Sequence, residues 1–139
     1  MQSKSGTVFI DTSFLKGLFD PKDDFYSQAK GTWLSFDEAQ TTLLTSNYIL
    51  DEFFTLIRKR LGRETLRKIR QDLMATKMIR TVRVTTSDEA KAWNWIFEDW
   101  SDLSFTDCVS FAVMKRLGLE KVATFDQHFA KAGFKLVGN

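Results

Sequence analysis

Short apolar runs typical of β-strands alternate along this chain with segments of helical periodicity, and this alternation constrains the fold more than any other feature. The expected strands span residues 7–10, 41–46, 78–84, 121–125 and 134–138. The expected helices span residues 12–19, 26–39, 48–61, 64–75, 86–100 and 107–116, with a short helical turn within 126–133. Because strands that alternate with helices form crossover units, the pattern predicts an α/β fold, with a mostly parallel sheet sandwiched by helices.

Local signals place some of the helix ends. Gly62 is expected to end the helix that begins near Tyr48. Thr86 and Glu89 have the spacing of a capping box, which predicts that another helix begins there. That helix carries an apolar stripe formed by Trp93, Ile96, Phe97 and Trp100.

The length and composition of the chain limit the protein classes to consider. Its 139 residues, 43% of them apolar, are enough to bury one core, so we expect a single domain over residues 1–139. Cys108 is the only cysteine, which excludes an internal disulfide, and the polar N-terminal segment does not resemble a secretory signal, so the cytoplasm is expected. No apolar run approaches the roughly 18 residues of a spanning helix, so a membrane role is not expected.

Four acidic residues occupy positions where α/β proteins place functional groups. Asp11 and Asp126 each follow an expected strand, at the carboxyl edge where open α/β sheets bind their ligands. Asp107 opens an expected helix and has an apolar residue one turn further on, which directs it toward the protein. Glu52 lies on the apolar, and therefore buried, stripe of the helix over 48–61.

Each of these acids also has a purely structural interpretation. Asp11 and Asp126 could cap the helices that follow them, Ser104 and Asp107 fit a capping box, and Glu52 could pair with a nearby arginine. Carboxylates that cluster at one sheet edge repel each other unless they are protonated or bridged by a cation, so their convergence favours a divalent cation. Oxygen ligands without a cysteine or histidine cluster favour Mg²⁺ or Mn²⁺ over zinc.

Such a centre suits hydrolysis of phosphodiesters. Mg²⁺ held by carboxylates keeps water ligands and accepts phosphate oxygens, so it can activate a water for in-line attack, and a second ion about 3.5–4 Å away would stabilise the leaving oxygen. The net charge of +2 does not by itself indicate a nucleic-acid binder. A local basic run is a candidate for RNA phosphate contacts, and equally for a solvated face or a subunit contact: Arg58, Lys59, Arg60, Arg63, Arg67, Lys68 and Arg70.

Other reactive or aromatic residues have simpler interpretations. Cys108 and His128 could form a nucleophilic dyad, but a cysteine is commonly buried as a small hydrophobe. His128 is better interpreted as ordering its turn or packing near the site than as a metal ligand. The tryptophans of the stripe, together with Trp95, fit a core or dimer contact better than base stacking.

Several motifs carry a family resemblance. The stretches "FIDTSFL", "YILDEFFTL", "LSFTDCVSFAVMKRLG" and "VATFDQHFAKAGF" resemble, in order and spacing, the motifs of PIN-domain proteins, particularly the VapC-like toxins of toxin-antitoxin pairs. The resemblance covers nearly the whole chain. It implies a three-layer α/β/α sandwich, an Mg²⁺- or Mn²⁺-dependent endoribonuclease, a homodimer, and an antitoxin that blocks the site.

The resemblance also assigns roles to individual residues. The catalytic, metal-binding quartet of the family is matched by Asp11, Glu52, Asp107 and Asp126. Ser13 and Thr106 match small hydroxyl residues that support the pocket. Some relatives carry a further acid near the positions of Asp99 and Asp102, and the number of metal ions, one or two, stays open.

The function expected from these observations is hydrolysis of RNA by metal-activated water, leaving a 3′-hydroxyl and a 5′-phosphate, in the toxin of a toxin-antitoxin pair. The alternatives are a PIN nuclease of RNA processing, a DNA nuclease of the flap type, and a catalytically silent PIN binding module. Loss of an acid would mark the silent module, and all four acids are present. Flap-type nucleases are commonly longer chains. RNA is favoured by resemblance alone, because nothing in the residues reads a 2′-hydroxyl.

Overall fold

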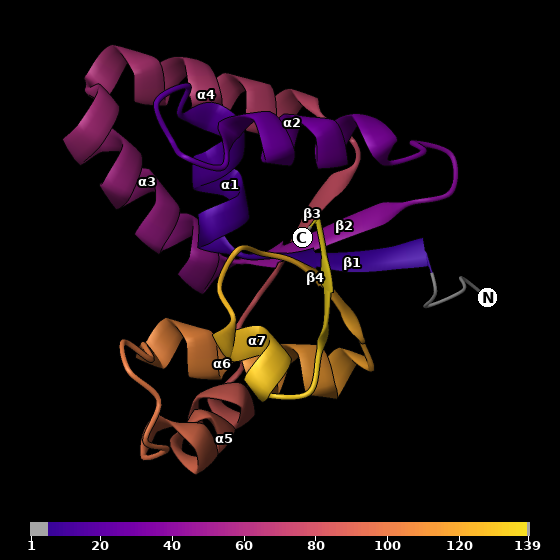
Figure 1. Cartoon of the computed structure of the whole chain (residues 1–139), viewed down its shortest axis with the longest axis vertical. Helices are drawn as coiled ribbons and strands as arrows, with labels where there is room; N and C mark the ends of the chain where they lie inside the picture. Colours follow the sequence, from indigo (N-terminus) through magenta and orange to yellow (C-terminus); the bar gives the residue numbers. More distant parts are fainter. Residues whose placement is uncertain (1–5, 139) are drawn as a thin grey trace.

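A computed structural model of the chain describes residues 6–138, which form one five-stranded sheet between two layers of helices (Figure 1). The strands are β1 (Thr7–Ile10), β2 (Thr42–Ser46), β3 (Ile79–Val82), β4 (Lys121–Ala123) and β5 (Lys135–Val137). The helices are α1 (Thr12–Phe19), α2 (Tyr26–Ser35), α3 (Asn47–Leu61), α4 (Arg63–Ala75), α5 (Thr86–Ile96), α6 (Phe105–Leu117) and α7 (His128–Lys131). The strand order is β3-β2-β1-β4-β5 and every pairing is parallel, so the predicted α/β/α sandwich is confirmed.

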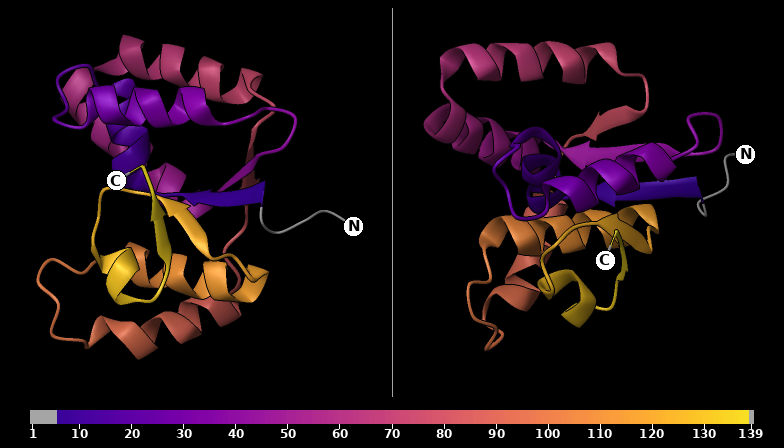
Figure 2. Two further views of the ribbon diagram at one scale, coloured as in Figure 1. Left: turned by 45° about the vertical axis from the view of Figure 1, so that its right-hand side comes forward. Right: turned by 45° about the horizontal axis from the view of Figure 1, so that its top comes forward.

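The direction of the chain across the sheet reverses at β1. Helices α1 to α4 cover one face and α5 to α7 cover the other, as the views in Figures 1 and 2 agree. From β1 the chain adds β2 and β3 on one side, and it then crosses to add β4 and β5 on the other. The boundary between β1 and β4 is therefore the switch point of the sheet, and open α/β sheets bind ligands beyond the carboxyl ends of the strands there.

The centre of the sheet is buried on both faces. Phe9 and Ile10 of β1 are fully buried, as expected for a parallel strand covered by helices on both sides. Helix α6 is buried from Asp107 to Met114, and its Phe111 ring packs edge-on against Trp95 of α5 and Phe129 of α7. This packing joins α6 to both of its neighbouring helices on that face of the sheet.

The structure corrects the predicted start of α5. Its capping box is formed by Thr85 and Asp88: Asp88 N donates to Thr85 Oγ1 at 3.1 Å, and Thr85 N donates to Asp88 Oδ2 at 2.9 Å. The prediction of Thr86 and Glu89 was wrong by one residue, because the two overlapping T-x-x-[DE] patterns cannot be told apart locally. Packing selects the first, since Asp88 also pairs with Arg116 of α6.

Other predicted boundaries shift for local reasons. Helix α2 ends at Ser35 rather than at Ala39, because a turn at Asp37 follows it. Helix α6 begins at Phe105, directly after its cap Ser104. Helix α5 ends at Ile96 rather than at Trp100, so the predicted stripe runs past its end, and Trp93 and Phe97 remain 55% and 82% exposed. No helix within residues 6–138 is both long and apolar enough to span a membrane.

Candidate metal centre

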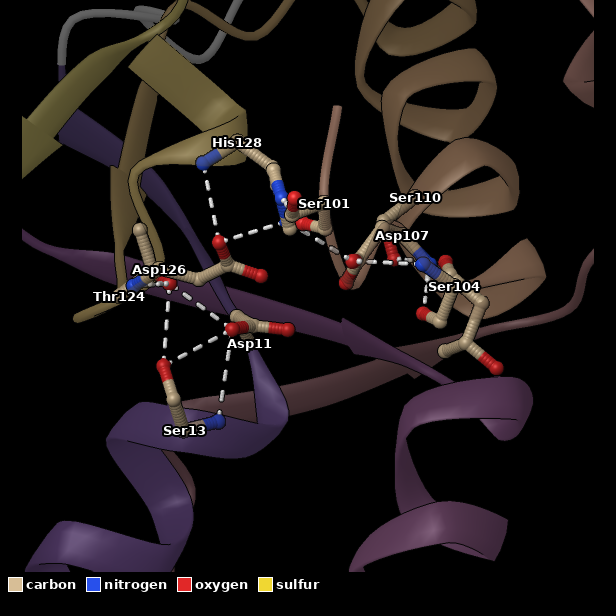
Figure 3. A network of polar contacts seen from close by, with 10 residues as sticks. Asp11, Ser13, Ser101, Ser104, Asp107, Ser110, Thr124, Asp126 and His128 are labelled. Carbon is tan, nitrogen blue, oxygen red and sulfur yellow. Dashed lines mark hydrogen bonds and ion pairs between the residues drawn. The ribbon is translucent and has the colours of Figure 1, made fainter. Parts of the chain in front are cut away.

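Three of the four predicted acids meet at the switch point of the sheet (Figure 3). Asp11 follows β1 directly and is aligned there by its N–H, which donates to the Ala123 carbonyl at 3.1 Å. Asp126 follows β4, and Asp107 lies in the first turn of α6. The charges of Asp11, Asp107 and Asp126 act on one another, so these carboxylates share one electrostatic environment.

Asp11 is 3% exposed and is held by two hydroxyl groups. Ser13 Oγ and Thr124 Oγ1 donate to Asp11 Oδ2 at 2.9 and 2.8 Å, and Ser13 N lies 3.4 Å from the same oxygen. Asp11 therefore does cap α1, as its structural interpretation proposed, and it also belongs to the acidic cluster. The two roles are compatible because a carboxylate has several lone-pair sites.

Thr124 is a part of the site that the sequence reasoning missed. Its hydroxyl donates to Asp11 and accepts the N–H of Asp126 at 2.9 Å, so one side chain positions two of the acids. The only signal in the sequence was its place between β4 and Asp126. Ser13 takes part in the same network, because its hydroxyl also accepts the N–H of Phe125 at 2.9 Å.

The other two acids are oriented by their own helix starts. Asp107 is 7% exposed and forms the predicted capping box with Ser104, with N–H to oxygen distances of 3.0 and 3.2 Å. Asp126 does not cap α7, whose N-cap is Gln127, but its Oδ1 accepts the backbone N–H of His128 at 2.9 Å. The backbone thus fixes both carboxylates without neutralising them.

Burial and mutual repulsion disfavour the charged forms of Asp11 and Asp107. Burial raises the pKa of Asp11 from 3.8 to about 6, against the hydrogen bonds from Thr124 and Ser13. Burial, then the charges of Asp11 and Asp126, raise the pKa of Asp107 from 3.8 to about 7. No lysine or arginine within residues 6–138 forms an ion pair with these three acids. Clustered carboxylate oxygens that no lysine or arginine of the described chain neutralises fit a divalent cation.

His128 faces the same cluster. Its Nδ1 lies 2.8 Å from Asp126 Oδ1 and 3.4 Å from Asp107 Oδ2, and its ring stacks on Trp100 at an interplanar angle of 9°. Burial opposes its protonation, but the Ser101 carbonyl and the charges of Asp126 and Asp107 outweigh burial, so the pKa of His128 is raised. The expected place beside the site is confirmed. Ligand atoms of Asp107, Asp126 and His128 all lie within 4.8 Å of one another.

The remaining predicted residues are less closely connected. Glu52 is half-buried on α3, less than its apolar stripe predicted, and no hydrogen bond or ion pair joins its side chain to another residue of the described chain. Thr106 is half-buried in α6, where its carbonyl accepts from Ser110 Oγ. Burial raises the pKa of the Cys108 thiol to about 11, which is the opposite of what a nucleophilic cysteine needs.

The basic run forms the exposed corner where α3 leads into α4. All seven of its basic residues are exposed, and two of them pair with acids: Arg60 with Asp20 at 3.5 Å and Arg67 with Glu64 at 3.4 Å. The start of α3 lies near the carboxyl edge of the sheet, and the corner lies at its far end (Figure 1). A contact of this corner with RNA phosphates stays a prediction.

A parallel sheet with carboxylates at its switch point is the arrangement expected of a PIN domain. The family model described as PIN domain matches residues 8–135, and the chain belongs to this family, whose members are metal-dependent nucleases. The relatives that the chain matches include "23S rRNA-specific endonuclease VapC20" of two Mycobacterium tuberculosis strains, each 34% identical over 128 residues, which are 91% of this chain and 95% of the relative.

Solved structures share the fold. The crystal structure of Mycobacterium tuberculosis VapC20, described as a sarcin-ricin loop cleaving toxin, superposes with a TM-score of 0.83 at 33% identity and covers 95% of this chain and 99% of that one. FitAcB from Neisseria gonorrhoeae matches with a TM-score of 0.69 at 14% identity, over 94% of this chain and 96% of that one. VapBC2 from Rickettsia felis, bound to a DNA fragment from the promoter, matches equally well at 10% identity over the same shares. The last two likenesses concern the fold alone.

Proposed function

We propose that this protein is a divalent-metal-dependent endoribonuclease that acts as the toxin of a toxin-antitoxin pair. The observation that supports it best is the meeting of Asp11, Asp107 and Asp126 at the switch point, where no lysine or arginine of residues 6–138 forms an ion pair with them. The relative at 34% identity is named as an endonuclease specific for 23S rRNA, so large-subunit ribosomal RNA is the substrate class that we propose. The proposed cation is Mg²⁺ or Mn²⁺.

The proposed ligands are Asp11, Asp107 and Asp126, with Glu52 as a direct or water-mediated fourth. A bound divalent cation supplies charge for the phosphate oxygens and lowers the pKa of a water. The chain supplies the placement: hydroxyl groups of Ser13 and Thr124 hold Asp11, while backbone N–H groups hold the other two acids. Because burial raises the pKa of Asp11 and Asp107, a cation that binds near neutral pH must displace protons from these two carboxyl groups.

The proposal extends to partners and location. A toxin needs an antitoxin, and the expected partner is a protein that covers the acidic site. A homodimer and a cytoplasmic location belong to the same proposal. Toxicity is separable from cleavage, since it also depends on a sensitive RNA in the cell. Without an antitoxin, the same chemistry would serve RNA processing.

The test is cleavage of ribosomal RNA and of a mixed RNA pool by the purified protein, with Mg²⁺ or Mn²⁺ against EDTA. Asp11→Asn and Asp107→Asn are the test variants. Asp51→Asn, the same chemical change at an exposed position of α3, is the matched control. We expect metal-dependent cleavage by the wild type and the control, with 5′-phosphate ends, and a loss of at least about 100-fold in the test variants. Full activity of Asp107→Asn would contradict the proposal, and absence of metal binding would favour the silent binding module.

A further inference from the structure

One ring nitrogen in the cluster has no role in the site as proposed so far. The Nδ1 atom of His128 is buried and lacks an aligned hydrogen-bond partner, although two carboxylate oxygens lie within 3.4 Å of it. Figure 3 shows the ring directed between Asp107 and Asp126. A buried polar atom without a partner is uncommon in a native protein and calls for an explanation.

The hydrogen bond of the other ring nitrogen, Nε2, indicates whether Nδ1 holds a proton or a lone pair in the neutral ring. His128 Nε2 lies 2.7 Å from the carbonyl oxygen of Ser101, which can only accept a hydrogen bond, so Nε2 carries a proton. In the neutral ring, the lone pair of Nδ1 therefore faces two carboxylates, an arrangement that repels unless a proton on Nδ1 or a metal cation lies between them. Histidines that bind metals commonly donate their second N–H to a backbone carbonyl in this way.

The spacing of the atoms suits a shared ion. Two donors at right angles around an ion with bonds of about 2.1 Å lie about 3 Å apart. The distances from Nδ1 to Asp126 Oδ1 and Asp107 Oδ2, 2.8 and 3.4 Å, lie on either side of that value. The stack on Trp100 and the hydrogen bond to Ser101 hold the ring in this direction.

We propose that His128 Nδ1 is a ligand of the metal ion, together with Asp107 and Asp126. This inference rests on the proposed function, because it concerns the same metal centre. It replaces the oxygen-only ligand set expected from the sequence with a mixed set of nitrogen and oxygen. Because imidazole binds transition metals better than it binds Mg²⁺, the site should prefer Mn²⁺ and later divalent transition metals over Mg²⁺.

The single histidine of the chain permits a direct test. The protein, produced without a histidine tag and with ¹⁵N-labelled histidine, is loaded with Mn²⁺ and studied by pulsed EPR, which detects hyperfine coupling from a directly bound nitrogen. Titration calorimetry then gives the ratio of Mn²⁺ to Mg²⁺ affinity for the wild type and for His128→Asn. Gln127→Asn, at the exposed neighbouring position, is the matched control. Circular dichroism checks that each variant is folded.

We expect ¹⁵N coupling in the wild type and in Gln127→Asn. Since loss of even an outer partner of a metal site costs about 10–100-fold in affinity, the Mn²⁺ to Mg²⁺ ratio should fall at least about tenfold in His128→Asn. Bound Mn²⁺ without ¹⁵N coupling would overturn this inference, and metal-dependent RNA cleavage by the same sample would leave the proposed function standing. Absence of Mn²⁺ binding would overturn both. The wild-type spectrum decides the question even if the variant does not fold.

Discussion

Replacing Asp107 with asparagine should stabilise the metal-free protein while it weakens the site. The charged carboxylate is buried beside Asp11 and Asp126, and its pKa rises from 3.8 to about 7 in the folded protein. Asparagine has the same shape, its side-chain oxygen can still accept the N–H of Ser104, and it carries no charge. The variant therefore removes the repulsion and keeps the capping box.

The magnitude follows from proton linkage. A carboxyl group whose pKa is raised on folding binds its proton more tightly in the native state, so the free energy of unfolding falls as the pH rises from about 4 to about 7. One pKa unit corresponds to about 1.4 kcal/mol, so the shift of Asp107 from 3.8 to about 7 destabilises the native state by about 4 kcal/mol at pH 8 and about 2 kcal/mol at pH 5. Asp107→Asn should recover a large part of each amount.

The assay is urea unfolding at pH 5 and pH 8, in EDTA and in Mn²⁺, for wild type, Asp107→Asn and the exposed control Asp51→Asn. In EDTA, Asp107→Asn should exceed the wild type in unfolding free energy, and by more at pH 8 than at pH 5. Mn²⁺ at 100 times its dissociation constant should stabilise the wild type by about 2.7 kcal/mol and the variant by less. The control should stay within about 0.5 kcal/mol of the wild type. The reasoning is refuted if Asp107→Asn is the less stable protein at pH 8 in EDTA.

Three further outcomes are expected. Arg116→Met leaves the buried carboxylate of Asp88 without its bidentate partner, so thermal or urea unfolding at neutral pH should report a loss of about 3–5 kcal/mol. The loss should shrink only at acid pH, below the depressed pKa of Asp88, where protonation dissolves the pair in the wild type. Ser13→Ala removes a hydrogen bond that favours the ionised cluster, so calorimetry at pH 6 should show weaker Mn²⁺ binding than in the wild type, with a smaller difference at pH 8. If the basic corner contacts RNA, Lys68→Gln should lower the slope of log affinity against log salt concentration by about 0.7, while Lys91→Gln on α5 leaves the slope unchanged.

Much of the fold was predictable from local patterns. The strands buried on both faces are continuous apolar runs, and the helices between them carry helical periodicity, so the α/β class and the parallel sheet followed from alternation alone. Helix ends were less predictable. Thr85 and Thr86 both begin a capping-box pattern, and only the ion pair of Asp88 with Arg116 decides between them, because a local motif carries no information about a partner on another helix.

The three acids that meet were recognisable in the sequence because Asp11 and Asp126 follow strands and Asp107 opens a helix, and the carboxyl ends of parallel strands lie at one edge of a sheet. Glu52, within α3, was singled out by its place on an apolar stripe. The hydrogen bonds and contacts that position these acids could not be identified from the sequence. The contacts of Thr124 with Asp11 and of His128 with Asp107 connect residues that are far apart in the chain. They form only when β1, β4 and α6 pack together. The residue types therefore determined which chemistry is possible, namely the binding of a cation by carboxylates at the edge of the sheet. The raised pKa values and the direction of the imidazole depend on burial and on spatial neighbours, which only the tertiary structure decides.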